Sequence, residues 1–276
     1  MSLKIGVMQG RLSKPIHNMI QAFPEDTWEK EFEIAKEIGL NCIEWIFDTY
    51  GKNPIMDKID QINDLRSKFN IEINSVCADY FMENKLFDEL ETNIEKNLET
   101  LLELAKNCKK IGVKIIEIPL IDNSSLKSDT DKKQLVDNLE KIIQKIENLG
   151  ITITLETDLP PDEFLNLLNM FKDKSIGANY DTGNSASLGY DVNKEIEVLG
   201  RKIMNIHLKD RILNGGTVPF GLGNTNFTDF FTMLKKINYS GDLIIQGARE
   251  QEISPEQDCI KYLRFTKQYL DKYCEK

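Results

Sequence analysis

Four short strings recur along the second half of the chain, and each ends an apolar run typical of a β-strand. They are Leu155–Thr157, Tyr180–Asn184, Asn205–Asp210 and Ile245–Gly247. Each offers one side chain that can bind a metal through oxygen or nitrogen, namely Glu156, Asp181, His207 and Gln246. These four residues are 25, 26 and 39 positions apart, and a strand, a helix and their loops take roughly 30 residues. The spacing therefore predicts successive β/α units whose strands end at one common face.

The rest of the chain repeats the same alternation. Strands are predicted near residues 3–10, 42–48, 73–80, 114–120, 151–156, 176–181, 203–208 and 243–246. Helices are predicted near residues 26–39, 56–69, 89–111, 130–148, 191–199, 227–237 and 255–273, and a further helix is predicted to start at Pro160–Glu163. Such alternation indicates a parallel sheet with crossover helices, and eight units favour closure into a barrel of about 250 residues. We therefore expect an α/β fold, a (β/α)8 TIM barrel, with residues 1–276 forming a single domain.

Charge and composition exclude several classes of partner. With 45 acidic and 35 basic residues, the formal net charge is −10, which argues against a nucleic-acid binder because such proteins neutralise phosphates. A local basic pocket for a phosphorylated small molecule stays open. No apolar run approaches the ~18 residues needed to span a membrane, and no signal peptide is recognisable. The five cysteines are scattered without a CxxC pair, as in reduced thiols, so we expect a cytoplasmic protein with no membrane partner.

One imidazole, two carboxylates and one amide form an oxygen-rich ligand set. This set predicts a divalent metal ion, with Mn²⁺, Mg²⁺ or Co²⁺ favoured and Zn²⁺ also accepted. Such an ion polarises a carbonyl or hydroxyl of a bound sugar and stabilises an enediolate. Glu156 is the best candidate for the catalytic base that moves the proton. Taken singly, Glu156 or Asp181 could equally be an ordinary strand-end carboxylate or helix cap, but four equivalent positions are hard to obtain by chance.

Basic residues follow the predicted ligands on the last two units. Lys209 has the same strand parity as His207, so it could anchor a substrate oxygen or act as an acid, or else pair with Asp210. Arg211 and Arg249 are candidate substrate-binding residues because a guanidinium presents a fork to phosphate or carboxylate. A salt bridge at the rim is the alternative for both arginines.

Glycines and several polar residues extend the predicted substrate site. The segments Gly215–Gly216 and Gly221–Asn224 could offer backbone N–H groups to a phosphate, although packing of a flexible loop is the alternative. Further predicted substrate contacts stand at loop ends: Gln9, Arg11, Asp48 and Asn184. His17, in the first long loop, could cover the pocket, and the mid-strand Glu44 and Glu117 could pair inside the barrel.

The strings around Glu156, Asp181 and His207–Asp210 resemble the xylose-isomerase-like TIM barrels. That superfamily includes sugar epimerases and isomerases, inosose dehydratases and the endonuclease IV type of DNA-repair enzyme. The strings Met8–Ser13 and Ile43–Trp45 look like its sugar phosphate isomerase/epimerase branch. The resemblance covers nearly the whole chain, is fairly specific for the superfamily and is poorly specific for the substrate. It implies that Glu156, Asp181 and His207 are metal ligands.

Gln246 departs from the pattern of the ketose epimerases. In that family the fourth ligand is a glutamate on the last strand, and the two glutamates exchange a proton on the two faces of the substrate. A glutamine can bind a metal through its oxygen but cannot be the second base. A carboxylate among Asp48, Asp79, Asp158 and Glu250 that reached the opposite face would restore a two-base reaction.

The expected function is therefore a divalent-metal-dependent isomerase or epimerase of a small sugar or sugar phosphate, with an enediolate intermediate and Glu156 as base. The alternatives are a metal-dependent dehydratase of a polyol or keto-sugar, and a sugar-binding protein without catalysis. The endonuclease branch uses a histidine-rich zinc site, whereas this chain has two histidines in all. A homo-oligomer stays open as a further partner.

Overall fold

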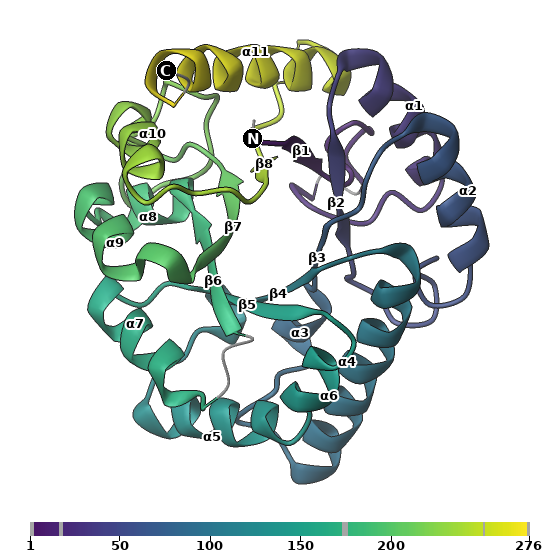
Figure 1. The fold of residues 1–276 in the computed structure, drawn as a ribbon, viewed down its shortest axis with the longest axis vertical. Helices are drawn as coiled ribbons and strands as arrows, with labels where there is room; N and C mark the ends of the chain where they lie inside the picture. The colour runs from purple at the N-terminus through teal and green to yellow at the C-terminus, as the bar shows by residue number, and fades with distance from the viewer. Residues whose placement is uncertain (1–2, 17–18, 173–175, 251, 275–276) are drawn as a thin grey trace.

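Eight parallel strands close on themselves into a barrel in the computed structural model, which describes residues 3–16, 19–172, 176–250 and 252–274 (Figure 1). Each strand pairs with the next along the chain, and the last pairs with the first. The strands are β1 (Ile5–Met8), β2 (Cys42–Ile46), β3 (Ser75–Cys77), β4 (Ile115–Leu120), β5 (Thr152–Thr157), β6 (Ile176–Asp181), β7 (Ile203–Leu208) and β8 (Leu243–Ile245). The predicted (β/α)8 TIM barrel is confirmed.

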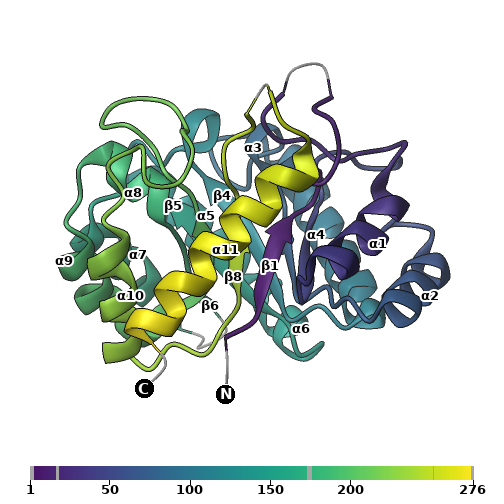
Figure 2. The same cartoon turned by 90° about the horizontal axis from the view of Figure 1, so that it is seen from above.

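Helices form the outer ring of the barrel (Figure 1). They are α1 (Trp28–Ile38), α2 (Ile59–Phe69), α3 (Tyr80–Glu83), α4 (Glu91–Ile111), α5 (Asp129–Glu140), α6 (Ile143–Glu147), α7 (Pro161–Met170), α8 (Thr182–Leu188), α9 (Val192–Leu199), α10 (Phe227–Lys236) and α11 (Pro255–Tyr273), with short 3-10 turns η1 (Asp122–Ser124) and η2 (Gly200–Lys202). The last helix, α11, crosses the outside of β1 and β8 (Figure 2). None of the described helices is both long and apolar enough to cross a membrane.

The helices differ from the sequence prediction in three places. The short α3 begins within the stretch predicted as a strand over 73–80, since β3 covers only Ser75–Cys77. The stretch predicted as one helix over 130–148 is split into α5 and α6 by a turn at Lys141–Ile142. The short α8 was not predicted, and it begins directly after β6 because the Asp181 side chain accepts hydrogen bonds from the N–H groups of Gly183 and Asn184. This side-chain capping satisfies the N–H groups that a helix leaves unpaired at its start.

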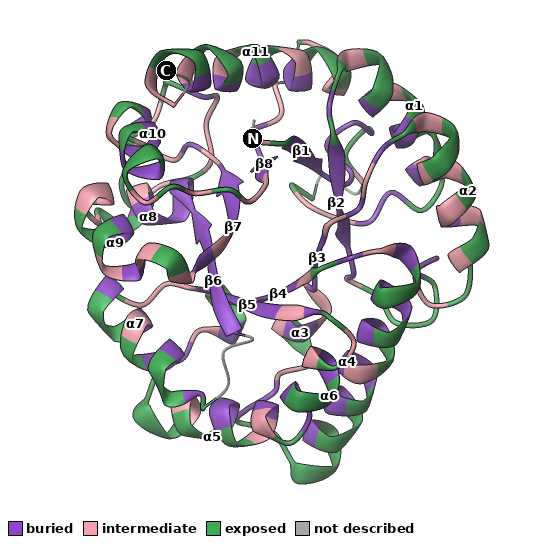
Figure 3. Cartoon of the chain, in the orientation of Figure 1, coloured by how far each residue is buried: buried purple, intermediate pink, exposed green. Residues whose placement is uncertain are grey.

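The apolar core lies between the strands and the helices, as the purple inner surfaces in Figure 3 show. The barrel interior also holds polar side chains. Asn205 on β7 donates a hydrogen bond to Glu44 on β2 (2.7 Å), and Ser75 on β3 contacts the same carboxylate. Because β2 and β7 are not neighbours in the sheet, these side chains meet across the inside of the barrel. This part of the interior leads to the mouth formed by the strand ends.

Candidate active site

A cavity of about 740 Å³ lies at the carboxyl ends of the strands. Its wall includes three of the four predicted ligands, Glu156, His207 and Gln246, and the predicted substrate contacts Arg11, Asp48, Asn184 and Arg211, together with Lys209. Asp181 lies directly beside these residues, since its carboxylate is 2.7 Å from the Lys209 Nζ. Active sites of TIM barrels occupy this face. The structure therefore gathers most of the predicted site in one place.

Glu156, Asp181 and His207 form a tight cluster at the ends of β5, β6 and β7. One ligand atom from each residue lies within 4.8 Å of the other two, and all three side chains are buried. His207 Nδ1 is 3.1 Å from Glu156 Oε2 and 3.9 Å from Asp181 Oδ2. In the sheet, Asp181 is the register partner of His207, so their side chains point to the same side of the barrel. The cluster has the donors of a divalent-metal site.

Gln246, the fourth predicted ligand, lines the same cavity as Glu156 and His207. Its backbone N–H donates to the carbonyl oxygen of Leu208 (2.8 Å), which keeps the residue beside β7 just after β8. Its Nε2 donates to Gln21 Oε1 (2.7 Å), whereas its buried Oε1 has no hydrogen-bond partner among the described residues. A buried amide oxygen without a partner is costly, and an amide oxygen is a ligand for hard divalent ions. The residues present therefore fit the predicted metal.

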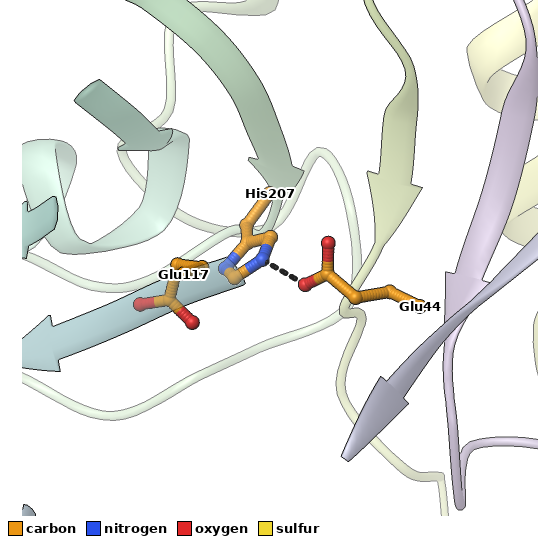
Figure 4. A group of neighbouring side chains, drawn as sticks. All are labelled: Glu44, Glu117 and His207. Atoms are coloured by element: carbon orange, nitrogen blue, oxygen red, sulfur yellow. Dashed lines mark hydrogen bonds and ion pairs between the residues drawn. The ribbon is translucent and has the colours of Figure 1, made fainter. Parts of the chain in front are cut away.

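A carboxylate on the opposite strand holds the imidazole (Figure 4). His207 Nε2 is 2.5 Å from Glu44 Oε1. Burial would lower the pKa of His207, but the Glu44 and Glu156 carboxylates raise it well above its usual value. Burial would likewise raise the pKa of Glu44, and the imidazole charge lowers it overall. Metal-binding histidines commonly use their second nitrogen in this way, which leaves Nδ1 directed at Glu156 and Asp181.

Glu117 on β4 forms a second group with Glu44 and His207 (Figure 4). It is fully buried, and burial together with the Glu156 charge raises the pKa of Glu117 well above its usual value. Glu117 is the register partner of Thr154, two residues before Glu156, so this second group lies deeper in the barrel. We favour the cluster of Glu156, Asp181 and His207 at the strand ends, in which Nε2 of the imidazole stays with Glu44.

The sequence placed Glu44 inside the barrel but did not predict its contact with His207, and a positioning role for Glu44 can be tested. Glu44→Gln keeps the size of the side chain but removes the charge that holds His207 Nε2. We expect the affinity for Mn²⁺ to fall by about 10- to 100-fold, as for other outer carboxylates of metal-binding histidines. Calorimetric titration measures this affinity. The matched control is Glu72→Gln, at a half-exposed glutamate paired with Lys4, and an equal loss in both variants would contradict the positioning role.

Lys209, Asn184 and Arg211 converge on the ligands. Lys209 Nζ is 2.7 Å from Asp181 Oδ2. Burial would raise the pKa of Asp181, but the Lys209 and His207 charges lower it. Asn184 donates to Glu156 Oε1 (2.6 Å) and accepts from Arg211 Nη1 (2.8 Å). These predicted residues therefore orient the carboxylates as well as lining the cavity.

Two predicted substrate contacts lie away from the cavity wall. Gln9 Oε1 accepts from the Ile46 N–H (3.0 Å), and the Arg249 guanidinium donates to the carbonyl oxygens of Gly10 and Ser13 (2.7 Å each). Both side chains are used to fix the loop after β1. The structure therefore does not bring Gln9 and Arg249 to the position that the sequence predicted.

The remaining predicted contacts reach the cavity by way of the first loops. Arg11 lines it, donates to the carbonyl oxygen of Ile20, and has a pKa that burial and Arg249 lower to about 10. Asp48 also lines it and accepts from the Phe23 N–H (2.8 Å). His17 lies outside the described residues. Gln21, which the sequence did not single out, connects Gln246 to Asp79, because its Nε2 donates to Asp79 Oδ2 (2.7 Å).

Comparison with known proteins finds one family and a consistent set of relatives. A family described as "Xylose isomerase-like TIM barrel" matches residues 32–269. The chain is 24% identical to SgbU of Haemophilus influenzae over 98% of this chain and 97% of that protein. It is 22% identical to the L-ribulose-5-phosphate 3-epimerase UlaE of Shigella flexneri over 90% of this chain and 91% of that protein.

Solved structures share the fold. An L-ribulose 3-epimerase superposes with a TM-score of 0.80 at 13% identity, covering 99% of this chain and 96% of that one. The 3-keto-D-glucoside 4-epimerase YcjR of E. coli has a TM-score of 0.77 at 16% identity, covering 97% and 100%. Similarity at this level of identity shows a common barrel architecture over the full length of these chains.

Proposed function

We propose, since this chain belongs to the xylose isomerase-like TIM barrel family, that it is a divalent-metal-dependent isomerase or epimerase of a small sugar. The observation that carries the proposal is the cluster of Glu156, Asp181 and His207, two of which line the same cavity as Gln246, whose Oε1 has no partner among the described residues. Similar proteins named as epimerases of sugar phosphates and of free sugars support the reaction class. Their names do not decide whether the substrate of this chain carries a phosphate.

Glu156, Asp181, His207 and Gln246 would hold the ion. When bound, a divalent ion such as Mn²⁺, Mg²⁺ or Co²⁺, with Zn²⁺ also accepted, supplies polarisation of the substrate carbonyl. Glu156 removes the proton from the carbon beside that carbonyl. Its carboxylate is fixed by Asn179 Nδ2 and Asn184 Nδ2 (2.6 Å each), which sets the direction of proton transfer. Lys209 at the cavity wall is the proposed partner of a substrate oxygen.

Gln246 cannot carry a proton, so epimerisation needs a second acid at the cavity. Asp48, Asp79 and Asp158 line the cavity, whereas Glu250 pairs with Lys261 and is absent from the cavity wall described. We choose Asp79 because Gln21 donates a hydrogen bond to it and accepts one from Gln246. Gln246 stands at the position where the ketose epimerases carry their second glutamate. Burial also raises the pKa of Asp79 above its usual value.

The proposal is tested by proton exchange with solvent. The purified chain with Mg²⁺ in D₂O is expected to place deuterium at a carbon next to the carbonyl of a ketose such as L-ribulose or D-fructose, read by NMR. Deuterium at carbon 3 with inversion indicates an epimerase, and deuterium at carbon 1 indicates an isomerase. Absence of exchange into any ketopentose or ketohexose, free or phosphorylated, would reject the proposal.

An Asp79→Asn variant separates the two acid–base groups. If Asp79 returns the proton on the second face, this variant still exchanges deuterium through Glu156 but no longer inverts the carbon. Inversion at the wild-type rate would show that Asp79 takes no part in the reaction. Exchange and inversion lost together, with Mg²⁺ still bound, would place Asp79 on the same proton transfer as Glu156.

A further inference from the structure

We propose that this cavity takes an uncharged sugar and discriminates against its phosphate ester. The inference rests on the proposed function and deepens it by naming the substrate class. Phosphate recognition in a barrel needs free backbone N–H groups or free cations at the strand ends. In the described part of the chain, several of the places that could supply them already make hydrogen bonds or ion pairs within the protein.

The glycine loop after β7 is filled by a carboxylate of the chain. Asp210 is fully buried, and it accepts hydrogen bonds from the N–H groups of Gly221 (2.8 Å), Gly223 (3.0 Å) and Thr225 (3.0 Å). The approach is so close that a Cβ on Gly223 would lie 2.2 Å from Asp210 Oδ1. Loops after strands seven and eight frequently bind phosphate in this fold. Here the Asp210 carboxylate occupies the anion position that the glycine pattern provides.

The loop after β8 is engaged in the same way. The N–H of Glu250 donates to Asp258 Oδ2 (3.0 Å). The Arg249 guanidinium, which could have met a phosphate, donates to backbone carbonyls of the loop after β1. Neither Arg249 nor Glu250 is among the described residues that line the cavity.

The cations of the cavity wall are also engaged. Lys209 pairs with Asp181 (2.7 Å), Arg211 Nη2 donates to the carbonyl oxygen of Gly215 (2.9 Å), and Arg11 donates to that of Ile20. Acidic side chains outnumber these three cations on the same wall: Asp48, Asp79, Glu83, Glu117, Asp122, Glu156 and Asp158. Burial raises the pKa of Asp79 and of Glu117. When these two residues are left out, five acidic side chains remain on the wall.

Carboxylates suit a free sugar and oppose a phosphate. A sugar hydroxyl donates a hydrogen bond, and an ionised carboxylate accepts several. A phosphate ester instead brings about two negative charges. Glu156 and Asp181 would balance the divalent ion, and the remaining carboxylates of the wall, Asp48, Glu83, Asp122 and Asp158, still outnumber its cations Arg11, Lys209 and Arg211.

Matched sugar pairs test the inference. The full chain with Mg²⁺ is compared on L-ribulose and L-ribulose 5-phosphate, and on D-fructose and D-fructose 6-phosphate, by exchange kinetics and by calorimetric binding. In each pair we expect the free sugar to have the larger kcat/KM and the tighter binding, by about 100-fold for one like-charge contact near a protein surface. Equal or better binding of the ester overturns the inference. A binding preference for the free sugar without proton exchange would keep the inference and reject the proposed function.

Salt and charge variants identify the cause. Because salt screens exposed charges, the preference for the free sugar is expected to shrink between 0.02 M and 0.5 M NaCl. Glu83→Gln combined with Asp122→Asn should raise the relative kcat/KM of the ester by about 10-fold. Asp122 has φ +50°, a conformation that asparagine accepts. The control is Asp129→Asn, whose side chain is 99% exposed on α5. If neither salt nor the double variant changes the preference for the free sugar, the electrostatic explanation is overturned.

Discussion

Glu156→Gln is expected to lower kcat for sugar turnover by about 10³-fold or more, the upper part of the range for loss of a general base. The reason is that one carboxylate carries two duties. Its oxygens are 3.1 Å from His207 Nδ1 and 2.6 Å from the amides of Asn179 and Asn184, so it is both a proposed ligand and the proposed base. A glutamine keeps the shape but accepts no proton and binds the ion more weakly.

Two measurements separate these duties. Metal content of the purified variant reports ligand loss, and kcat at saturating Mn²⁺ reports loss of the base. His207→Ala is the companion, because it removes the nitrogen ligand and is expected to lose the metal with the fold intact. The matched control is Glu163→Gln on α7, whose half-exposed side chain pairs with Lys132. Unchanged metal content in His207→Ala would eliminate the site, and full activity of Glu156→Gln at saturating metal would eliminate the base.

Asp210→Ala is expected to lower the free energy of unfolding by about 3–5 kcal/mol, since several buried or half-buried donors lose their acceptor at once and each unsatisfied donor costs about 1–3 kcal/mol. The donors are the backbone N–H groups of Gly221, Gly223 and Thr225. Urea unfolding gives the free energy, and hydrogen exchange at these three amides locates the effect. Exchange there should become faster before the rest of the barrel changes.

Two control variants test whether the loss comes from the acceptor oxygens of Asp210. Asp210→Asn retains one acceptor oxygen, so it should recover part of the stability. Asp162→Ala, at an exposed aspartate that pairs with Lys194, should change the free energy by no more than about 0.5 kcal/mol, as is usual for surface substitutions. Equal losses in Asp210→Ala and Asp162→Ala would mean that the loop after β7 does not depend on this carboxylate.

The sequence was sufficient for the barrel and for the residues that end its strands. Alternating apolar runs and helical periods determine a β/α order, and chain closure then brings the strand ends to one face. Glu156, Asp181 and His207 meet there because they stand at the same step of three consecutive units. The unpartnered oxygen of Gln246 could not be foreseen, since it depends on how Gln21 takes up the amide nitrogen.

Contacts across the barrel could not be predicted from the sequence. Strand parity indicates which side of the sheet a residue occupies, but it does not indicate which distant strand that residue faces. Glu44 and His207 are 163 residues apart, and they meet through the barrel interior. Likewise, glycines in a loop are typical of anion binding whether the anion is a ligand or the chain's own Asp210. The contacts of Arg249 could not be foreseen for a similar reason, because backbone carbonyls and phosphates attract the same guanidinium.

The bond between Glu44 and His207 also determines how this barrel can be divided. All four proposed metal ligands lie in the half of the chain that begins at β5, so a half-barrel fragment would contain the complete ligand set. Such a fragment would lack β2 and the carboxylate that holds the imidazole from the other side. The two halves are thus joined at the centre as well as along their two seams, β4–β5 and β8–β1. Transplanting the ligand half alone would carry over the ligands without the group that orients the histidine.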